Sequence, residues 1–456
     1  MPKPAPKPIS RPDGASWLQR VSLFRSDMFS SQPDRLYRAW MAEMRGPFYR
    51  SFLVNQPDLV RRVLNDPEKF PKSTIIHDSL RGLLGESVFL TNGEVWKRQR
   101  RIIDPAFEGP KLSFPAMRDA AQAAVERMKT GEQEVEYITS YLAADVIFRT
   151  LFSIPITSEI ATDVFGAFRK YQRAQPLWNL PGLLRLPNWF PRFPSKSTRS
   201  SATEIRGLLE KLVEDRCQAI ANGTAPSDLA TRIMTTKDPE TGTCFSPEEM
   251  VDQVAIFFLA GHETSASALA WGLYLLADNP EFQDVVASEG RELGQIPEFS
   301  GLSRLKITRD VFRETLRLFP PVPMMVREAA EATKFRDRKI PARSLVILSP
   351  WHLHRHERLW DNPDDFDPNR WQTENGKTNK REAYIPFSAG PRVCTGAGFA
   401  MVEGVLLLSM LVREFRFEVT DKKPVPVAHL TVRAKDGIYL KITSRDPDNI
   451  SERTTE

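Results

Sequence analysis

The sequence predicts a mainly α-helical protein with a small β region. Residues 112–170 have helical character throughout, and residues 247–278 form a second long stretch without a helix breaker. Strand character is confined to a pair around residues 47–54, a segment after Pro321 and a hairpin that begins near residue 429. Because the 456 residues contain no Gly/Ser-rich linker and no internal repeat, one large core fits better than several small domains.

Composition excludes several classes of protein. A net charge of +5 without a basic stripe does not favour nucleic acid as a partner. The three cysteines, Cys217, Cys244 and Cys394, form no disulfide framework and suit a reducing cytoplasm. No apolar run reaches the roughly 18 residues of a membrane span, so we expect no transmembrane anchor and a cytoplasmic location.

The two ends of the chain differ from its body. Residues 1–14 are rich in proline and lack the apolar core of a signal peptide, which predicts an extended tail. Residues 443–456 are polar, and we expect a second tail there. A single domain is expected over residues 15–442, in a protein that is a monomer.

In the first quarter of the chain, residues 58–64 have the pattern of a short amphipathic helix after the strand pair. Residues 71–90 look irregular, and their apolar side chains, which include Leu84 and Val88, could face a ligand or pack beneath a loop. Asn92 suits a helix N-cap. Trp96 and Arg100 then lie four residues apart on one face of that helix.

Two further segments leave alternatives open. Lys97, Arg98, Arg101 and Lys111 could form a basic patch for an acidic partner or a solvated helix face. Residues 175–194, rich in Pro, Trp and Leu, could be a mobile apolar lid or a packed connector between helices.

The longest helix begins at Ser246, an N-cap followed by Pro247 and by a glutamate at the third position, and it ends before Asn279-Pro280. Residues 254–259 and 266–276 are apolar almost all round, so the helix is buried. In its middle stands Ala260-Gly261-His262-Glu263-Thr264. Glycine, threonine and an acid are poor choices for a buried helix, and stability alone does not explain them.

A second helix ends at Pro320-Pro321, and Glu314 and Arg317 share one of its faces. The chain then enters a strand that contains Met324, Met325, Val326 and Arg327. His352, His354 and His356 alternate as if on one side of an extended strand, but no nearby Cys or acidic ligands complete a metal site.

The segment 387–396, Phe-Ser-Ala-Gly-Pro-Arg-Val-Cys-Thr-Gly, holds Cys394 between glycines. Gly390 and Gly396 permit turns with positive φ and the close approach that a thiolate ligand needs. Phe387 would shield the sulfur from water, and Arg392 offers a fixed cation for a carboxylate. The apolar helix expected over residues 397–411 would direct its positive end towards the sulfur.

Phe387-x-x-Gly390-x-Arg392-x-Cys394-x-Gly396, with Trp96-x-x-x-Arg100, Glu263-Thr264 and Glu314-x-x-Arg317 in order before it, resembles the motif set of the cytochrome P450 family. The resemblance extends over about residues 15–442. It implies the mainly α haem-thiolate fold with a small β region, haem b with Cys394 as the metal ligand, and O₂ as co-substrate.

The resemblance also implies roles for individual residues. Thr264 would hydrogen-bond oxygen and hold water, and Glu263 would relay protons as the acid of the pair. Arg370 would join Glu314 and Arg317 in a structural triad, while His262 would be structural. The residues expected to contact haem are Trp96, Arg100, Ala260, Gly261, Arg327, His354, Phe387, Gly390, Arg392, Cys394 and Gly396. Those expected to border the substrate are Leu84, Val88, Phe257, Ala260, Met324, Met325, Val326 and Leu430.

The activity implied is insertion of one oxygen atom from O₂ into a small, hydrophobic organic substrate by hydroxylation, epoxidation or dealkylation. Electrons would come from separate partners, a ferredoxin and its reductase. Two alternatives share the fold: a peroxygenase that consumes H₂O₂, and a haem-thiolate sensor or binding protein without turnover. The Glu263-Thr264 pair argues against both, because neither requires a proton relay.

Overall fold

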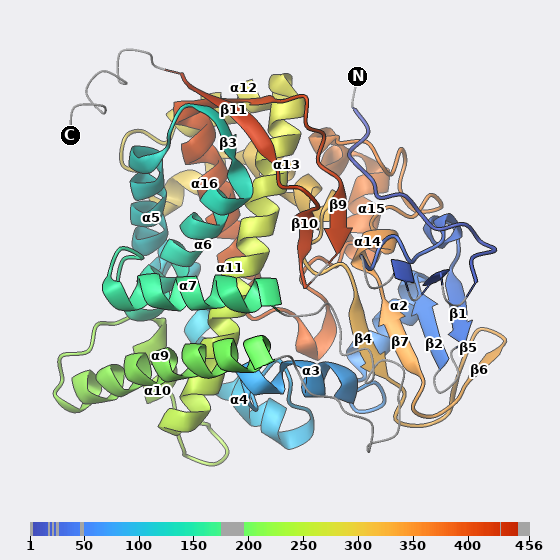
Figure 1. The fold of residues 1–456 in the computed structure, drawn as a ribbon, viewed down its shortest axis with the longest axis horizontal. Coiled ribbons are helices and arrows are strands. Elements are labelled where there is room, and N and C mark those ends of the chain that lie inside the picture. The colour runs from blue at the N-terminus through green and yellow to red at the C-terminus, as the bar shows by residue number, and fades with distance from the viewer. Residues whose placement is uncertain are drawn as a thin grey trace.

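The computed structural model describes residues 3–16, 19–20, 22–23, 27–45, 50–174, 196–428 and 430–445. It has the mainly α architecture with a small β region that the sequence predicts (Figure 1). In that view the helices fill the left and centre, and the sheet of β1, β2, β7 and β4 stands at the right. No helix within these ranges is long and apolar enough to cross a membrane.

The helices follow the chain as a series of α-helices and short 3₁₀ turns. The α-helices are α2 (Pro57–Asn65), α3 (Thr74–Leu84), α4 (Gly93–Phe107), α5 (Phe114–Arg127), α6 (Val135–Phe152), α7 (Glu159–Ala174), α9 (Lys196–Ala221), α10 (Leu229–Thr235), α11 (Pro247–Asp278), α12 (Pro280–Arg291), α13 (Lys306–Leu318), α14 (Pro350–Leu353), α15 (Glu374–Glu382) and α16 (Ala397–Glu414). The 3₁₀ turns are η1 (Asp34–Tyr37), η2 (Pro110–Leu112), η3 (Phe299–Arg304), η4 (Pro368–Gln372) and η5 (Gly390–Arg392).

The strands form small sheets that join distant parts of the chain. They are β1 (Met41–Arg45), β2 (Arg50–Val54), β3 (Gly131–Glu134), β4 (Met325–Glu328), β5 (Thr333–Phe335), β6 (Arg338–Ile340), β7 (Leu345–Leu348), β8 (Phe415–Val419), β9 (Pro426–Ala428), β10 (Val432–Ala434) and β11 (Tyr439–Ser444). The largest sheet has the order β1-β2-β7-β4, in which β2 and β7 are parallel with Val54 opposite Leu348. β9 and β10 form the C-terminal hairpin, while β11 lies between β3 and β8.

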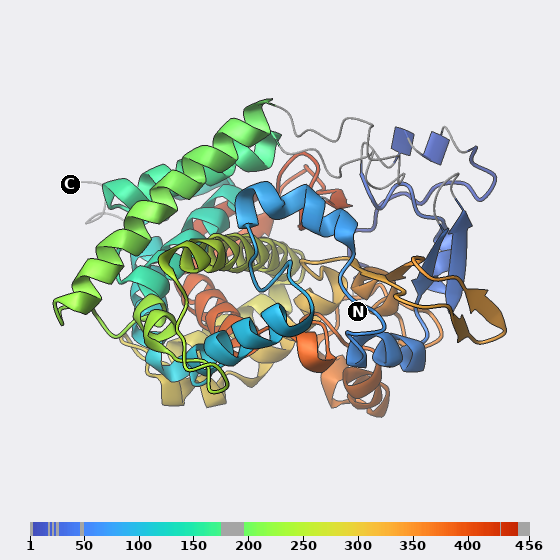
Figure 2. The ribbon, with the colours of Figure 1, turned by 90° about the horizontal axis from the view of Figure 1, so that it is seen from below.

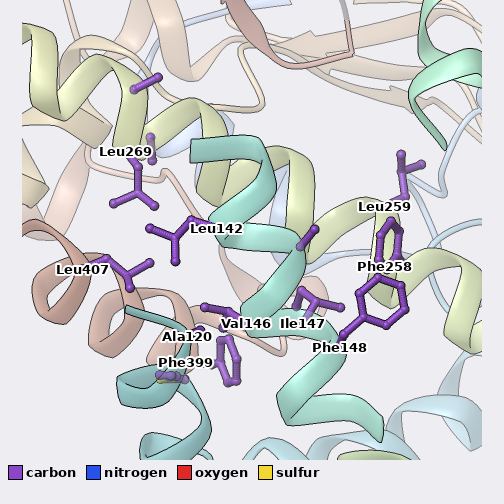
Figure 3. Close-up of a cluster of buried hydrophobic side chains, with 14 of the residues drawn as sticks. Ala120, Leu142, Val146, Ile147, Phe148, Phe258, Leu259, Leu269, Phe399 and Leu407 are labelled. Atoms are coloured by element: carbon purple, nitrogen blue, oxygen red, sulfur yellow. The ribbon is translucent and has the colours of Figure 1, made fainter. Parts of the chain in front are cut away.

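Helix α11 is the central element of the fold. It begins with a complete capping box, in which Ser246 and Glu249 each accept a hydrogen bond from the other's backbone N–H. Seen from below, α11 lies between the α7–α9 pair and α16 (Figure 2). The core beside it consists of apolar side chains from α5, α6, α11 and α16, among which Leu142, Phe258 and Leu407 are buried (Figure 3).

Three segments differ from the sequence prediction. Residues 71–90, expected to be irregular, contain α3, because the Ser73 hydroxyl caps the N–H of Ile75 and the helix ends at Gly85 with φ 52°. Residues 112–170 are not continuously helical, since β3 and the turn after Ser153 divide them into α5, α6 and α7. His352 lies in the short helix α14, capped by Ser349, rather than in a strand.

The proline-rich N-terminal segment is extended and packs against the body of the protein. The N–H of Ala5 donates to the Asp364 carbonyl at 2.8 Å, and the N–H of Phe366 donates to the Lys3 carbonyl at 3.0 Å. Lys7 pairs with Asp364 at 3.0 Å and covers the Tyr37 ring. We call residues 3–11 the N-terminal strap. The lid or connector considered for residues 175–194 lies outside the described residues.

Candidate active site

A cavity of about 1540 Å³ occupies the centre of the molecule. Its walls come from α3, α4, α11, the start of α16 and the segments before β4 and η5. Both Glu263 and Thr264 line it. So do most of the residues expected at the cofactor or substrate: Val88, Trp96, Arg100, Phe257, Ala260, Gly261, Met324, Met325, Val326, Arg327, Phe387, Arg392, Cys394, Gly396 and Leu430.

The loop before α16 presents Cys394 to the cavity. The Cys394 N–H donates to the Phe387 carbonyl at 2.9 Å, which closes the loop on itself. Ser388 and Gly390 turn the chain with φ values of 63° and 69°. A Cβ on Gly390 would stand 2.5 Å from the Leu64 carbonyl, so this glycine lets the loop pack on α2 and does not line the cavity. Gly396 needs no left-handed conformation, contrary to the prediction, because its φ is −87°.

The Cys394 side chain is exposed to the cavity although protein surrounds it. Burial raises the pKa of its thiol, against the smaller opposing effects of the Gly396 N–H and the Arg100 charge. A cation at the sulfur would reverse that balance, because metal ions bind cysteine as the thiolate.

The polar break in α11 directs two neighbouring side chains to different places. Thr264 lines the cavity, and its hydroxyl donates to the Ala260 carbonyl at 2.5 Å, so its oxygen can accept a hydrogen bond from the cavity side. Glu263 instead accepts hydrogen bonds from Gln172 of α7 and from Thr431 and pairs with Arg433 of β10. Burial would raise the pKa of Glu263, but the charge of Arg433 opposes burial and the pKa is lowered.

Gly261 and His262 connect α11 to α6. A Cβ on Gly261 would lie 2.3 Å from the Cδ1 of Ile147, so close packing on α6 requires this glycine in addition to the room that it leaves in the cavity. His262 is fully buried, and its Nε2 lies 2.7 Å from the Ser140 hydroxyl. Burial lowers the pKa of His262 to about 4, which keeps the ring neutral.

Four cations gather at one side of the cavity. Arg392 lies over the Trp96 ring at 4.1 Å, and its Nε and Nη1 are buried without a hydrogen-bond partner among the described residues. Lys72, which the sequence analysis missed, forms a β-bridge with Arg327, and both line the cavity with Arg100. Burial, together with the other cations, lowers the pKa of Lys72 well below its usual value and that of Arg392 to about 9.

This cation cluster suits an anionic cofactor. Arg100 donates to Asp104 and to the Val393 carbonyl, both at 2.8 Å, whereas among the described residues the Arg327 side chain donates only to the Val326 carbonyl, a weak contact at 3.4 Å. A group that carries carboxylates would satisfy the unpaired guanidinium nitrogens of Arg392 and offset the mutual repulsion. The cysteine, the apolar cavity and these cations therefore fit haem with its two propionates.

Besides Gly390, two residues predicted at the cofactor or the substrate do not line the cavity. His354 is fully buried away from it, where its Nε2 accepts the N–H of Ile385 at 2.9 Å, so the expected contact at the haem edge is wrong. Leu84 packs in the core, and its neighbour Leu83 lines the cavity instead with Ile76 and Leu80. The periodicity of α3 explains this difference, because Leu83 follows Ile76 by about two helical turns and shares its face, whereas Leu84 is turned about 100° from Leu83.

Glu314, Arg317 and Arg370 meet in the core below the loop. The Arg317 Nη2 and the Arg370 Nε both donate to the Glu314 Oε1 at 2.8 Å. The Arg317 Nε donates to the Glu314 Oε2 at 2.9 Å, and the other donors of both arginines bind backbone carbonyls of residues 354–365. Burial opposes ionisation of Glu314, but the two arginines outweigh it and lower its pKa. The triad thus joins α13 to the segment that leads to η4.

Glu403 is a second acid at the cavity that the sequence analysis missed. It lies on α16, is 1% exposed, and its Oε2 accepts a hydrogen bond from Ser265 of α11 at 2.6 Å. Burial raises its pKa to about 8. Two features of the sequence could have revealed it. Glu403 is the seventh residue of an apolar helix, and the polar Ser265 follows Thr264 on the helix that faces it.

The basic patch expected on α4 is largely neutralised by acids. Lys97 pairs with Glu94 and Glu68, Arg98 with Glu249 at 2.7 Å, and Arg101 with Asp238 at 2.6 Å. The guanidiniums of Arg98 and Arg101 therefore connect α4 to the start of α11 and the segment before it. The residues available to an acidic partner are fewer than the sequence suggested.

Comparison with known proteins agrees with this geometry. The family model described as Cytochrome P450 matches residues 23–442. A cyclooctat-9-en-7-ol 5-monooxygenase of Streptomyces melanosporofaciens is 32% identical over 85% of this chain and 83% of its own. A pentalenene oxygenase of Streptomyces avermitilis is 29% identical over 87% and 88%. The haem domain of cytochrome P450DA has the same fold, with a TM-score of 0.81 over 98% of this chain at 24% identity.

The fold, the cysteine at the cavity and these relatives define a haem-thiolate monooxygenase, an enzyme that uses O₂. The family model spans nearly the whole chain and the relatives match most of their length. This chain belongs to the cytochrome P450 family.

Proposed function

We propose that the cavity holds haem b with the Cys394 thiolate as iron ligand, in a single domain over residues 15–442 between two terminal tails. The observation that carries this proposal is the exposure of the Cys394 side chain to a cavity that also presents a cluster of cations, in which two buried nitrogens of Arg392 lack a hydrogen-bond partner among the described residues. When bound, the haem supplies the oxygen chemistry: one atom of O₂ enters the substrate and the other leaves as water.

The residues of this chain bind and orient around that group. Arg392, Arg327, Arg100, Lys72 and the Trp96 N–H hold the propionates, and Phe387 keeps water from the sulfur. Ala260 and Gly261 leave space beside α11. The Thr264 hydroxyl donates its hydrogen bond to the Ala260 carbonyl, so its oxygen accepts a hydrogen bond from a group in the cavity. Glu263 moves protons towards Thr264.

The walls of the cavity favour a largely hydrocarbon substrate. Leu83, Val88, Phe257, Met325 and Val326 present apolar side chains to it. The names of the two Streptomyces relatives denote a cyclic alkenol and an alkene as their substrates. We propose a hydrophobic, terpenoid-like molecule for this enzyme, which titration of the haem spectrum with such compounds would test.

The electrons come from separate carriers, which we propose to be a ferredoxin and its reductase in the cytoplasm. Lys111 is the member of the sequence-predicted basic patch without a carboxylate partner among the described residues, and it lies in η2, which packs beside α16. Reconstitution with purified carriers tests this assignment, and turnover with H₂O₂ alone at an equal rate would favour the peroxygenase.

The decisive experiment is the difference spectrum of the reduced protein with carbon monoxide. We expect a strongly red-shifted Soret band in the natural protein and its loss in Cys394→Ala. Cys217→Ser, a change at a half-buried cysteine outside the cavity, is the matched control and should keep the band. A band at the position of a neutral ligand in the natural protein would contradict the proposal.

A further inference from the structure

Glu263 is held by residues that lie away from the cysteine loop. Side chains at neighbouring positions of a helix point about 100° apart, so Glu263 turns from the face that carries Thr264. Its Oε2 accepts from the Thr431 hydroxyl at 3.2 Å and pairs with the Arg433 guanidinium at 2.7 Å. The Gln172 amide donates to its Oε1. The C-terminal hairpin and α7 therefore fix the carboxylate.

Arg433 is shared between this acid and a second one. Its charge also acts on Glu136 and Glu134, at the start of α6. Glu136 is tied to the same hairpin, because its Oε1 accepts the N–H of Ala434 at 3.0 Å. Glu134 caps α6 by accepting the N–H of Glu136 at 2.8 Å. One guanidinium thus stands between an inner and an outer carboxylate.

The side chains that hold Glu263 and Glu136 all line the cavity. We call Glu134, Glu136, Gln172, Glu263, Thr431 and Arg433 the polar arm, and all of them are cavity-lining residues. Within the arm Glu263 is 5% exposed and Glu136 is half-buried, and Tyr137, which follows Glu136 in the cavity wall, is 43% exposed. The arm therefore leads from the helix position beside Thr264 to solvent, on a course lined by polar rather than apolar groups.

The two acids differ in how readily they take up a proton. Burial raises the pKa of Glu136 more than Arg433 lowers it, whereas at Glu263 the charge of Arg433 opposes burial and the pKa stays below its usual value. Near neutral pH the outer acid is thus the easier one to protonate. Other titratable or charged groups that face the arm are Tyr137, Arg169, His262, Lys435, Asp436 and Tyr439.

We propose that the polar arm is the path by which protons from solvent reach Glu263, with Arg433 as a positioning residue that Glu263 and Glu136 share. The Glu136 carboxyl gives its proton inward and regains one from solvent. The Glu263 carboxylate takes up a proton and releases it into the cavity beside Thr264. Arg433 keeps its charge and transfers no proton. This inference rests on the proposed role of Glu263 as proton relay.

The test compares Glu136→Gln, Arg433→Gln, Arg433→Lys and Glu263→Gln in the full-length, haem-loaded enzyme. We expect Glu136→Gln and Arg433→Gln to lower kcat about tenfold with KM unchanged, to raise the solvent deuterium isotope effect and to divert reducing equivalents to peroxide. Arg433→Lys should recover most of the rate. In the natural enzyme kcat should fall as the pH rises through the raised pKa of Glu136, and this decline should disappear in Glu136→Gln.

Glu136→Gln is the decisive variant, because its amide oxygen can still accept the Ala434 N–H and preserve the hairpin. Lys441→Gln, at an exposed β11 position outside the cavity, is the matched control and should behave as the natural enzyme. If Glu136→Gln and Arg433→Gln match the natural rate, pH profile and isotope effect while Glu263→Gln is slow, the path is refuted and the proposed function stands. If Glu263→Gln is also unchanged, the relay role of Glu263 fails as well. The carbon monoxide spectrum of each variant reports separately on Cys394.

Discussion

At the scale of single residues, the cation cluster determines how firmly the cofactor is held. Two buried guanidinium nitrogens of Arg392 lack a hydrogen-bond partner among the described residues, so a propionate would form its strongest new hydrogen bonds with this residue of the cluster. A charge-assisted hydrogen bond contributes about 1.5–3 kcal/mol, and each 1.4 kcal/mol is about tenfold in an equilibrium constant. We therefore expect Arg392→Gln to lose haem about 10- to 100-fold faster.

Haem transfer to an excess of an apo-globin acceptor measures this rate. Arg118→Gln, which removes a surface guanidinium that pairs with Asp119, should leave it unchanged. Equal haem loss from Arg392→Gln and the natural protein would show that the guanidinium does not bind the cofactor.

Glu403 makes stability depend on pH. Its pKa is about 8 in the folded protein and near the usual 4.3 when unfolded, so between these values the folded state binds the extra proton. Folding stability must then decline as pH rises through this window, by about 1.4 kcal/mol for each pH unit at most. Glu403→Gln, a neutral mimic of the protonated acid, should remove the decline.

Urea unfolding of the haem-loaded protein at pH 6 and pH 8 tests this expectation. At pH 8 the natural protein should unfold at a lower midpoint urea concentration than Glu403→Gln. The two proteins should differ least at pH 6. A difference of the same size at both pH values would mean that Glu403 is not protonated in the folded state.

At the scale of elements, the triad connects α13 to the segment before η4. Glu314→Gln leaves Arg317 and Arg370 buried without their carboxylate, a change that costs about 3–5 kcal/mol of unfolding free energy. Because the arginines lower the pKa of Glu314, its contribution is present above the unfolded pKa and is lost as pH falls through the folded pKa.

Urea unfolding near neutral pH should show this loss for Glu314→Gln. Glu374→Gln, which breaks an exposed pair with Lys377, is the control and should change little. If the two variants unfold at the same urea concentration, the buried pairs do not stabilise the fold.

At the scale of the whole molecule, the N-terminal strap holds the region around Asp364. A chain that lacks residues 1–11 loses the backbone hydrogen bonds of Lys3 and Ala5 and the Lys7–Asp364 pair. At about 0.5–1.5 kcal/mol for each net hydrogen bond, we expect a loss of about 1–4 kcal/mol in unfolding free energy. Ile9→Ser, at a side chain that is 85% exposed, is the control.

Thermal unfolding followed by circular dichroism would report the loss as a lower midpoint for the shortened chain. An unchanged midpoint would indicate that the strap follows the fold without stabilising it.

Contiguous motifs predicted most of the fold and the site, because their chemistry is local. The Cys394 loop, the polar break of α11 and its capping box lie where the sequence indicated. Lys72, Glu403 and Arg433 were missed, since each belongs to a segment whose position depends on tertiary packing. The prediction that Leu84 lines the cavity was wrong by one residue, because α3 was not recognised. In a helix, the rotation about the axis decides which of two neighbouring leucines faces the cavity.

The parallel pairing of β2 with β7 has a consequence for biosynthesis. About 290 residues must be synthesised after Val54 before its partner strand β7 is available to pair with it. At roughly 5–20 residues per second, β2 waits about 15–60 s with only β1 as a neighbour. Throughout translation the emerging chain therefore carries an open strand edge beside Phe52 and Leu53, and holdase chaperones that shield such edges should bind the nascent enzyme between these two points of synthesis.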